Sequence, residues 1–372
     1  MKVSRSTSRS SIHSRFAVQK ARPHAVLVVL AGLVFCLGFT ADANAQAPAS
    51  FVTFEVPGAT FTSPASINDF GDVTGWWSSV GYLSNEQGFV RDRCGAITDF
   101  SVPKSVTTNP GSINDSGTIV GNWFSPTGGP PTDFVRRADG HFTYFSVPGA
   151  TSTYAASVND LGQVLGSWGN ASGAVGGFVL GWDGRIATFQ VPGAGSLIID
   201  DLNNQGESVG AWSTGSSSTA YHGFVRTWQG AITSFDAPGA TATYPSAVND
   251  WGEIVGSFSS SSGFQGFLRA PNGSFTEFNV PGAQTTYAQT INDAGEIAGY
   301  WYDATNHFHG FVRSPGGTIA SFDAPGAVST GVASINFEGD IAGFYYDSQN
   351  ILHGFVGVPR YNNPWRGCAT HR

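Results

Sequence analysis

VNDWGEIVGSFSSSSGFQGFLR, residues 248–269, is one copy of a unit that recurs along most of this chain, and the unit decides the fold. Its Asn249, Asp250 and Gly252 are a turn signal, because Asn and Asp side chains bond nearby backbone groups and Gly tolerates a positive φ. Buried-type and less apolar residues then alternate through residues 254–258, which is typical of a half-buried strand. After a loop rich in Ser and Gly, residues 266–269 have the composition of another short strand. The stretch predicts antiparallel strands joined by tight turns.

Three landmarks of this unit each recur seven times, 43 to 46 residues apart. The first is Ile-Asn-Asp or a close relative, with its Asn at Asn68, Asn114, Asn159, Asn203, Asn249, Asn292 and Asn336. The second is Gly-Phe-Val or a relative, around Phe89, Phe134, Phe178, Phe224, Phe267, Phe311 and Phe355. The third is Pro-Gly-Ala, ending at Ala59, Ala150, Ala194, Ala240, Ala283 and Ala327, with an eroded copy at Lys104.

Each unit predicts a meander of four short strands, which is the pattern of a propeller blade. Residues 51–56 match the fourth strand of a unit although no first three strands precede them, and the last unit stops after its third strand near Val356. An open array would instead need atypical capping units at both ends. We therefore expect an all-β fold, a seven-bladed β-propeller of four-stranded antiparallel blades. We expect its ring to be closed by pairing of the N-terminal strand with the three C-terminal strands.

The N-terminus has the three parts of a secretory signal. Six basic residues come first, an apolar run of about fifteen residues follows, too short to span a bilayer, and small residues surround a cleavage site after Ala45, with Ala47 as the second choice. Phe35 before Cys36 argues against lipid attachment there. We expect a signal peptide over residues 1–45, a propeller over 46–358 and a tail over 359–372. The protein would be secreted or periplasmic, with no membrane span after signal cleavage.

The mature chain is acidic, since residues 46–372 keep 12 basic and 25 acidic residues. Such a surface repels phosphate backbones, so nucleic acid is not an expected partner. Cys94 falls in the turn between the third and fourth strands of the first unit, and Cys368 lies in the tail after the last unit. Both therefore emerge on one side of neighbouring blades, and we expect a disulfide between them.

Aromatic residues that vary between units are the candidate ligand site. Loops between the second and third strands and those between blades open on the side where propellers usually hold ligands. The expected binding residues are Trp76, Tyr154, Tyr244, Tyr287, Tyr300, Tyr302, Phe344 and Tyr346. A glycan or a peptide could bind to a loop face of this composition. The alternative interpretation is that these residues are scattered surface aromatics without a ligand.

Other recurring residues favour structure over chemistry. Each Asn-Asp-x-Gly copy offers one carboxylate, too few oxygens for calcium. Its spacing resembles the Asp-box turn of sialidase propellers, which braces a blade. His222, His309 and His353 occupy equivalent places on different blades and would radiate outward, so we expect no metal site. The recurrent Arg after Gly-Phe-Val, as in Arg91 and Arg136, indicates a solvated structural role. No catalytic set and no cofactor motif is recognised.

The unit resembles the HAF repeat of exported bacterial proteins, which combines Ile-Asn, a Gly-containing turn, a Gly-aromatic strand and a His-Ala-Phe tripeptide. Here the tripeptide is His-Gly-Phe at Phe224, Phe311 and Phe355, and four units lack the His. The resemblance covers residues 51–358. It implies an extracytoplasmic repeat architecture and no particular activity.

Three functions remain open from the sequence. The first is an exported, non-enzymatic binding or scaffold protein that recognises a carbohydrate or a protein through the loop face. The second is an extracellular polysaccharide hydrolase or lyase, which would show charged residues with shifted pKa converging at the channel mouth. The carboxylates to inspect are Asp200, Asp201, Glu207, Asp303 and Asp347. The third is a purely structural surface protein, whose channel would be plugged by apolar side chains; the oligomeric state stays open.

Overall fold

The computed structural model describes residues 46–80, 85–126, 132–215, 219–359 and 368. The predicted signal peptide, residues 1–45, and most of the predicted tail lie outside the described residues. The described chain belongs to one compact unit, Asp42–Arg372, and contains strands and turns without a helix. Accordingly, no membrane-spanning helix occurs among the residues described.

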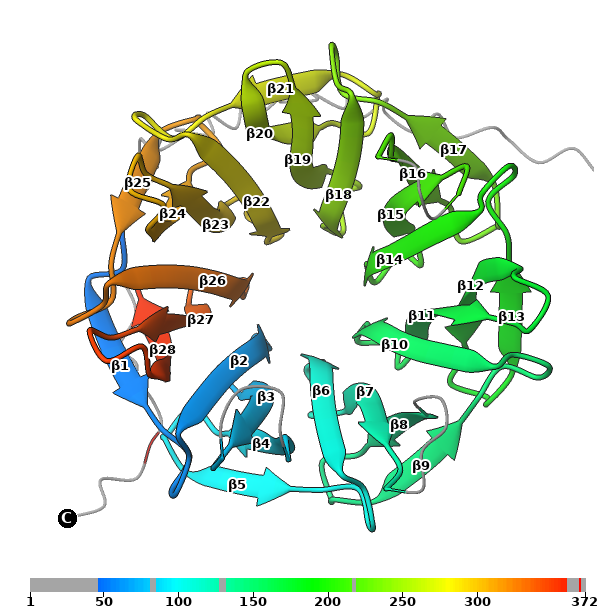
Figure 1. Cartoon of the computed structure of the whole chain (residues 1–372), viewed down its shortest axis with the longest axis horizontal. Helices are drawn as coiled ribbons and strands as arrows, with labels where there is room; N and C mark the ends of the chain where they lie inside the picture. The colour runs from blue at the N-terminus through cyan, green and yellow to red at the C-terminus, as the bar shows by residue number, and fades with distance from the viewer. Residues whose placement is uncertain (1–45, 81–84, 127–131, 216–218, 360–367, 369–372) are drawn as a thin grey trace, which may run out of the picture. The chain divides into compact units, whose positions relative to one another are not determined.

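In the described part of the chain, twenty-eight strands form seven units of four antiparallel strands around a central opening (Figure 1). The first three units are β2 (Phe61–Ile67), β3 (Val73–Ser78), β4 (Gln87–Arg91) and β5 (Ile97–Phe100); β6 (Thr107–Ile113), β7 (Ile119–Phe124), β8 (Thr132–Arg136) and β9 (Phe142–Phe145); and β10 (Ser152–Val158), β11 (Val164–Gly169), β12 (Val175–Leu180) and β13 (Ile186–Phe189). The fourth and fifth are β14 (Ser196–Leu202), β15 (Ser208–Ser213), β16 (His222–Arg226) and β17 (Ile232–Phe235); and β18 (Ala242–Val248), β19 (Ile254–Ser260), β20 (Gly263–Arg269) and β21 (Phe275–Phe278). The sixth is β22 (Thr285–Ile291), β23 (Ile297–Tyr302), β24 (Phe308–Arg313) and β25 (Ile319–Phe322), and the seventh is β26 (Ser329–Ile335), β27 (Ile341–Tyr346), β28 (Leu352–Val358) and β1 (Ser50–Phe54). This all-β, four-stranded architecture is a β-propeller, as the repeat predicts.

The turns form as their residues dictate. In the fifth unit, Oδ1 of Asn249 accepts hydrogen bonds from the N–H groups of Trp251 and Glu253 at 3.2 and 2.9 Å, and Gly252 has φ +75°. At the other end of this unit's inner strand, the N–H of Ala240 bonds to the carbonyl of Ala237 at 3.1 Å, with Gly239 at φ +68°. A positive φ at the third residue of a hydrogen-bonded turn is the type II signature that Pro-Gly predicts.

The core lies between units rather than within them. The Phe of every third strand is fully buried, and it packs with apolar residues of the neighbouring unit. Gly256 in β19 has no room for a side chain, since a Cβ there would lie 2.1 Å from the carbonyl oxygen of Tyr244. Equivalent glycines let every inner strand approach its second strand closely.

The expectation that the recurrent arginines are solvated is wrong. Arg91, Arg136 and Arg313 are only 4%, 8% and 6% exposed. Their guanidinium carbons lie 5.1, 4.5 and 5.0 Å from the centre of a Phe ring on the outer strand of the preceding unit, and Arg226 and Arg269 do the same at 4.8 and 4.7 Å. The arginine of the third strand points into the seam between units, where cation–π contact replaces solvation.

The two ends of the described chain share the seventh unit. β1 pairs antiparallel with β28, from Ser50 opposite Val358 to Phe54 opposite Gly354, so it supplies the outer strand of that unit. β28 also makes a single parallel bridge to β2, at Phe61 and Leu352. The strands of the first and seventh units therefore belong to one eight-stranded sheet.

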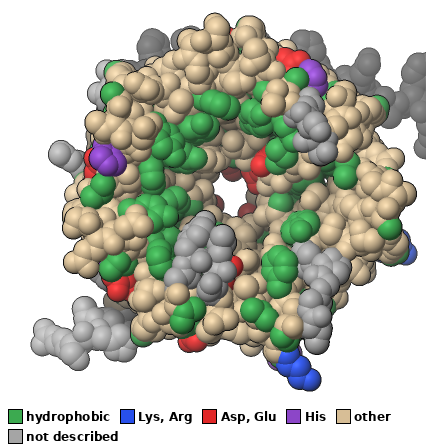
Figure 2. All heavy atoms as spheres, in the orientation of Figure 1, with side chains coloured by type: hydrophobic (Ala, Val, Ile, Leu, Met, Phe, Trp, Pro, Cys, Tyr) green, Lys and Arg blue, Asp and Glu red, His purple; other side chains and the backbone are tan. Residues whose placement is uncertain are grey.

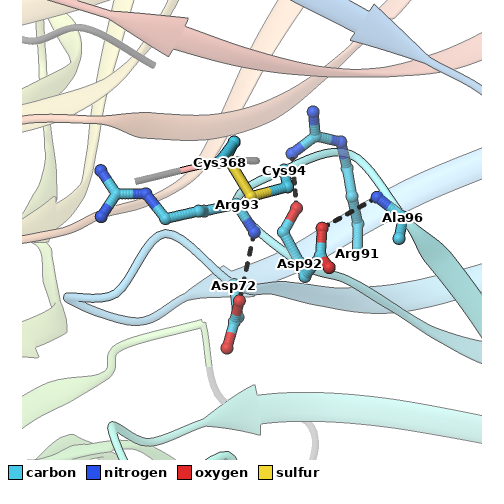
Figure 3. Close-up of a disulfide and its surroundings, with 7 residues drawn as sticks. All are labelled: Asp72, Arg91, Asp92, Arg93, Cys94, Ala96 and Cys368. Carbon is cyan, nitrogen blue, oxygen red and sulfur yellow. Dashed lines mark hydrogen bonds between the residues drawn. A yellow bond between two sulfur atoms is a disulfide. The ribbon is translucent and has the colours of Figure 1, made fainter. Parts of the chain in front are cut away.

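A disulfide joins Cys94 to Cys368, as expected from their positions, with Cα atoms 5.5 Å apart and 274 residues between them in sequence (Figure 3). The turn that contains Cys94 is held by two carboxylates. Oδ1 of Asp92 accepts the N–H of Ala96 at 2.8 Å, and Asp72 accepts the N–H of Arg93 at 3.2 Å. The bond thus ties the chain beyond the last unit to an ordered turn of the first.

Candidate functional site

The propeller presents two different faces. Loops between second and third strands and those between units open on one face, which we call the aromatic face; the Asn-Asp turns open on the other, the turn face. Figure 2 views the aromatic face, where hydrophobic side chains form a band beside the central opening along the fifth to seventh units. This band is the most distinctive feature of that face.

The band belongs to a continuous chain of aromatic rings, the aromatic arc, which begins at Tyr221 in the fourth unit. It consists of Tyr221, Tyr244, Phe264, Tyr287, Tyr300, Tyr302, Phe308, Phe344 and Tyr346. Successive ring centres lie 5.2 to 6.4 Å apart, and every member is half-buried. Tyr287, Tyr300 and Tyr302 form its centre, with centres 5.2 and 6.0 Å apart between neighbours. The arc crosses four consecutive units.

Burial affects the phenol groups of three tyrosines of the arc. Burial, and then the neighbouring phenol groups, raise the pKa of Tyr244, Tyr287 and Tyr300 above the ordinary value. The Tyr300 side chain also hydrogen-bonds that of Gln289, which lines the central channel. The arc can therefore offer flat apolar ring faces together with hydroxyl groups that donate and accept hydrogen bonds.

Packing of the propeller does not demand the rings that the second strands contribute to the arc. The position of Tyr300 and Phe344 in the second strand, read from the strand register, holds a small or polar residue in four other units: Asn122, Ser167, Ala211 and Ser257. The position of Tyr302 and Tyr346 likewise holds Ser78, Gly169, Ser213 and Ser259. A scaffold that folds with Ser or Gly at these places has aromatic rings there for another reason.

Six of the eight expected binding residues belong to the arc. Tyr154 does not: it lies on β10 of the third unit, 43% exposed. Trp76 lies on β3 of the first unit, half-buried opposite Ser63. The expected set lacks Tyr221, Phe264 and Phe308, although each stands three residues before the Phe landmark of its unit. That constant offset is the signal that could have found them.

The central channel is lined by the inner strands, and each of these has a one-residue bulge at the same place. The bulged residues are Ala65, Gly111, Ala156, Asp200, Ser246, Gln289 and Ala333, and all seven line a cavity of about 280 Å³. Bulges commonly redirect side chains. Asp200 and Gln289 are the two members with long polar side chains, so the channel is not plugged by apolar groups.

Asp200 and Asp201 have different roles. Oδ1 of Asp201 accepts the Ser157 hydroxyl at 3.0 Å, and its Oδ2 accepts the N–H of Val248 at 3.1 Å. In two other units a Ser hydroxyl replaces this carboxylate as the acceptor: Ser66 and Ser112 accept an N–H of the next inner strand. Asp200 instead faces the cavity, and burial together with the charge of Asp201 raises the pKa of Asp200 to about 8. Asp200 is thus a protonated carboxyl at neutral pH.

At the turn face the channel ends in two sets of hydrogen bonds between units. The amide of each landmark Asn donates to the carbonyl of the landmark Asn in the next unit, at 2.8 to 3.3 Å. The following residue adds a second set, in which Oδ1 of Asp115, for example, accepts the N–H of Asp69 at 2.9 Å. A cavity of about 200 Å³ lies inside. The Asn-Asp turns are structural, as expected, and they also connect the units.

The remaining three carboxylates lie apart from one another, and each interacts with polar groups near it. The Asp303 pKa is lowered to about 2, chiefly by the Thr305 hydroxyl, and Asp303 lies 3.6 Å from Nε2 of His309. Asp347 likewise lies 3.3 Å from Nε2 of His353, and its lowered pKa is due first to the N–H of Ile351. Oε2 of Glu207 lies 3.4 Å from the Asn203 amide. Of the five carboxylates to inspect, two therefore meet at the channel. Within the described part of the chain no group of His, Cys, Asp or Glu is arranged to hold a metal ion.

Comparison with known proteins establishes the fold alone. No family model matches the chain, and no curated protein matches it. Among solved structures, a streptogramin B lyase is 15% identical, with a TM-score of 0.56 over 82% of this chain and 97% of that one. The inactive H270A virginiamycin B lyase from Staphylococcus aureus is 15% identical, with a TM-score of 0.58 over 83% and 99%. The β-propeller domain of the Trilobed protease from Pyrococcus furiosus is 10% identical, with a TM-score of 0.59 over 84% and 99%. All three are propellers, and identities this low carry no activity across.

Proposed function

We propose that this protein is an exported, non-enzymatic binding propeller that recognises a carbohydrate through the aromatic arc. One observation carries the proposal: nine rings form one chain of contacts on one face. Four of these rings stand at second-strand positions where four other units have Ser, Gly, Ala or Asn, namely Tyr300, Tyr302, Phe344 and Tyr346. Pyranose rings present flat C–H faces that stack on aromatic rings, while their hydroxyl groups bond to phenols such as those of Tyr287 and Tyr300.

The proposal includes a location outside the cytoplasm and a closed ring. The disulfide between Cys94 and Cys368 supports the location, because such bonds persist in oxidising compartments. The pairing of β1 with β28 and the hydrogen bond from Asn336 to Asn68 support closure, since both join the two ends of the repeat. The family resemblance to HAF repeats agrees with export.

A glycan-array experiment tests the function. The mature protein, residues 46–372, is compared with a Tyr300→Ser/Tyr302→Ser variant, in which both substitutions copy residues of the fifth unit, Ser257 and Ser259. Tyr154→Ala is the control, because Tyr154 lies outside the arc, exposed at the inner-strand position that Tyr287 holds within it. We expect reproducible glycan binding that falls at least tenfold in the double variant and is unchanged in the control. No binding to any glycan, or equal binding by the double variant, would overturn the proposal.

A hydrolase or lyase acting on polysaccharide is the second candidate, favoured by Asp200. A carboxyl that stays protonated near neutral pH is the form a general acid needs, and Gln289 connects its channel to Tyr300 of the arc. An assay for release of reducing or unsaturated sugar ends, with wild type and Asp200→Asn, separates the two functions. Product release that Asp200→Asn abolishes would replace the binding role with an enzymatic one.

A further inference from the structure

Five of the seven seams between units contain the same niche, and each is filled by an arginine of the protein itself. The guanidinium of Arg91 lies over Phe54 of the preceding unit, and its Nη1 donates to the carbonyl of Asp92 at 3.1 Å. On the other side it approaches the turn glycine, since a Cβ on Gly95 would lie 3.4 Å from Nη2. The ring and glycine contacts are repeated by four more arginines, with Nη2 at 3.3 to 3.7 Å from the corresponding glycine position: Arg136, Arg226, Arg269 and Arg313. Arg136 and Arg313 also donate to the corresponding carbonyl, at 3.4 and 3.2 Å. The niche is thus built from a ring, a carbonyl and a glycine.

The third unit keeps the niche but lacks the arginine. Leu180 occupies the arginine position, opposite Ile186 as Arg226 is opposite Ile232. Phe145 of the preceding unit supplies the ring. The turn glycine is Gly184, where an added Cβ would meet nothing within 4 Å. The guanidinium place at this seam is therefore empty space.

The vacant place opens into a cavity of about 700 Å³, a size typical of ligand sites. Phe145, Leu180 and Gly184 line it, together with Tyr144 and Trp182, which are 44% and 83% exposed. The Tyr144 position holds Asp, Thr, Ser or Glu in other units: Asp99, Thr188, Ser234, Glu277 and Ser321. Two exposed aromatic rings therefore flank the niche. At its rim Arg137 is offset by Asp139.

The seventh unit also lacks the arginine, but there other residues occupy the place of the guanidinium. Gly357 stands at the arginine position there, and a Cβ on it would lie 2.8 Å from the ring of Pro48. Phe51 packs against Phe322 and Phe355 of the same seam, with ring centres 5.9 and 5.6 Å apart. The N-terminal segment fills that place, whereas beside Leu180 the guanidinium place opens into the cavity and no described residue fills it.

We propose that the seam between the second and third units is a binding site for a guanidinium group, and that its occupant is an arginine side chain of a partner polypeptide. The ring of Phe145 and the carbonyl of Gly181 receive the guanidinium, as a ring and a carbonyl together do at the seams of Arg91, Arg136 and Arg313. The faces of Tyr144 and Trp182 hold the rest of the side chain and its flanking backbone, and indole is the strongest cation–π partner among the aromatic side chains.

The test is titration of the mature protein with N-acetyl-arginine N-methylamide, followed by NMR of the Trp indole N–H signals. N-acetyl-citrulline N-methylamide is the uncharged probe of the same shape. We expect saturable binding of the arginine probe, at least tenfold weaker binding of the citrulline probe, and a shift of the Trp182 signal. In Leu180→Arg the protein's own arginine fills the niche, so this variant should unfold at a higher temperature and lose the binding.

Trp182→Ala and Trp228→Ala keep the proposal falsifiable should Leu180→Arg not fold. Trp228 occupies the same turn position one unit later, beside a niche that Arg226 already fills, and is 68% exposed. Trp182→Ala should weaken the arginine probe severalfold, and Trp228→Ala should leave it unchanged. Absence of saturable binding, equal affinity for citrulline, or full binding by Leu180→Arg would each overturn the proposal, without bearing on the aromatic arc.

Discussion

The amide nitrogen of Asn336 lies 3.1 Å from the carbonyl oxygen of Asn68, 268 positions earlier in the chain. It is one of seven equivalent hydrogen bonds, each donated by one unit to the next. The landmark asparagine therefore shapes its own turn through Oδ1 and connects two units through Nδ2. Both functions are needed at once, which only Asn among the turn-forming residues supplies.

Asn336→Ala should destabilise the propeller by about 1–3 kcal/mol, because the buried carbonyl of Asn68 loses its partner and the turn loses its Oδ1 acceptor. Chemical denaturation followed by Trp fluorescence measures the change. Gln205→Ala, an exposed residue of an equivalent turn, is the control and should be neutral. Equal stability of the two variants would show that the connection contributes nothing.

Reduction of the disulfide between Cys94 and Cys368 should lower the free energy of unfolding by about 2–5 kcal/mol, because the bond restricts a long loop of the unfolded chain. The measurement is denaturation with and without a reductant. In Cys94→Ser/Cys368→Ser the reductant should have no effect. If wild type is also insensitive to it, the two cysteines do not clasp the chain ends.

The buried carboxyl of Asp133 should make the free energy of unfolding fall as pH rises from about 4 to about 6. It is fully buried, with Oδ1 accepting the N–H of Ala155 at 2.8 Å, and burial raises its pKa from 3.8 to about 6. Between these values the folded state holds a proton that the unfolded state has lost, so stability is fully present below pH 4 and falls by roughly 2–3 kcal/mol up to pH 6. Asp133→Asn should remove this part of the pH profile of unfolding. A profile unchanged by the substitution would falsify the assignment.

Gly310→Ala should destabilise by about 1–3 kcal/mol, because a Cβ there would lie 2.6 Å from the ring of the buried Phe322. Gly326→Ala is a contrasting case: a Cβ there meets nothing within 4 Å, and only the positive φ of 79° opposes it. Thermal unfolding of both variants separates crowding from backbone strain. A larger loss for Gly326→Ala would contradict the crowding argument.

Most of the fold could be predicted from the sequence, because turns and strand alternation are local properties. The landmarks at Asn249 and Phe267 mark a hairpin and a buried ring without knowledge of any neighbour. The pairing of β1 with β28 followed from counting strands at the two ends. The candidate site was partly predictable, since variation against a repeat identified Tyr287 and Tyr300.

Contacts between units could not be predicted in the same way. Arg91 was expected in solvent, although it lies over Phe54, because the direction of a third-strand side chain depends on how adjacent sheets approach. The bond from Asn336 to Asn68 depends on the same lateral spacing. Phe308 was missed because it precedes its landmark at the end of a loop of variable length. The unfilled guanidinium place beside Leu180 is defined by its filled counterparts in other units, so the sequence around Leu180 alone does not predict it.

The bulge that interrupts every inner strand has a consequence for the width of the passage along the propeller axis. One residue per unit leaves the regular pairing there, so its side chain can change without altering the hydrogen-bonded register on either side. The seven bulged positions therefore set the width of the channel independently of one another. Gly111 and Ala156 widen the channel, whereas Asp200 and Gln289 narrow it. A passage of this construction can acquire a new size or polarity through single substitutions while the surrounding sheets stay the same.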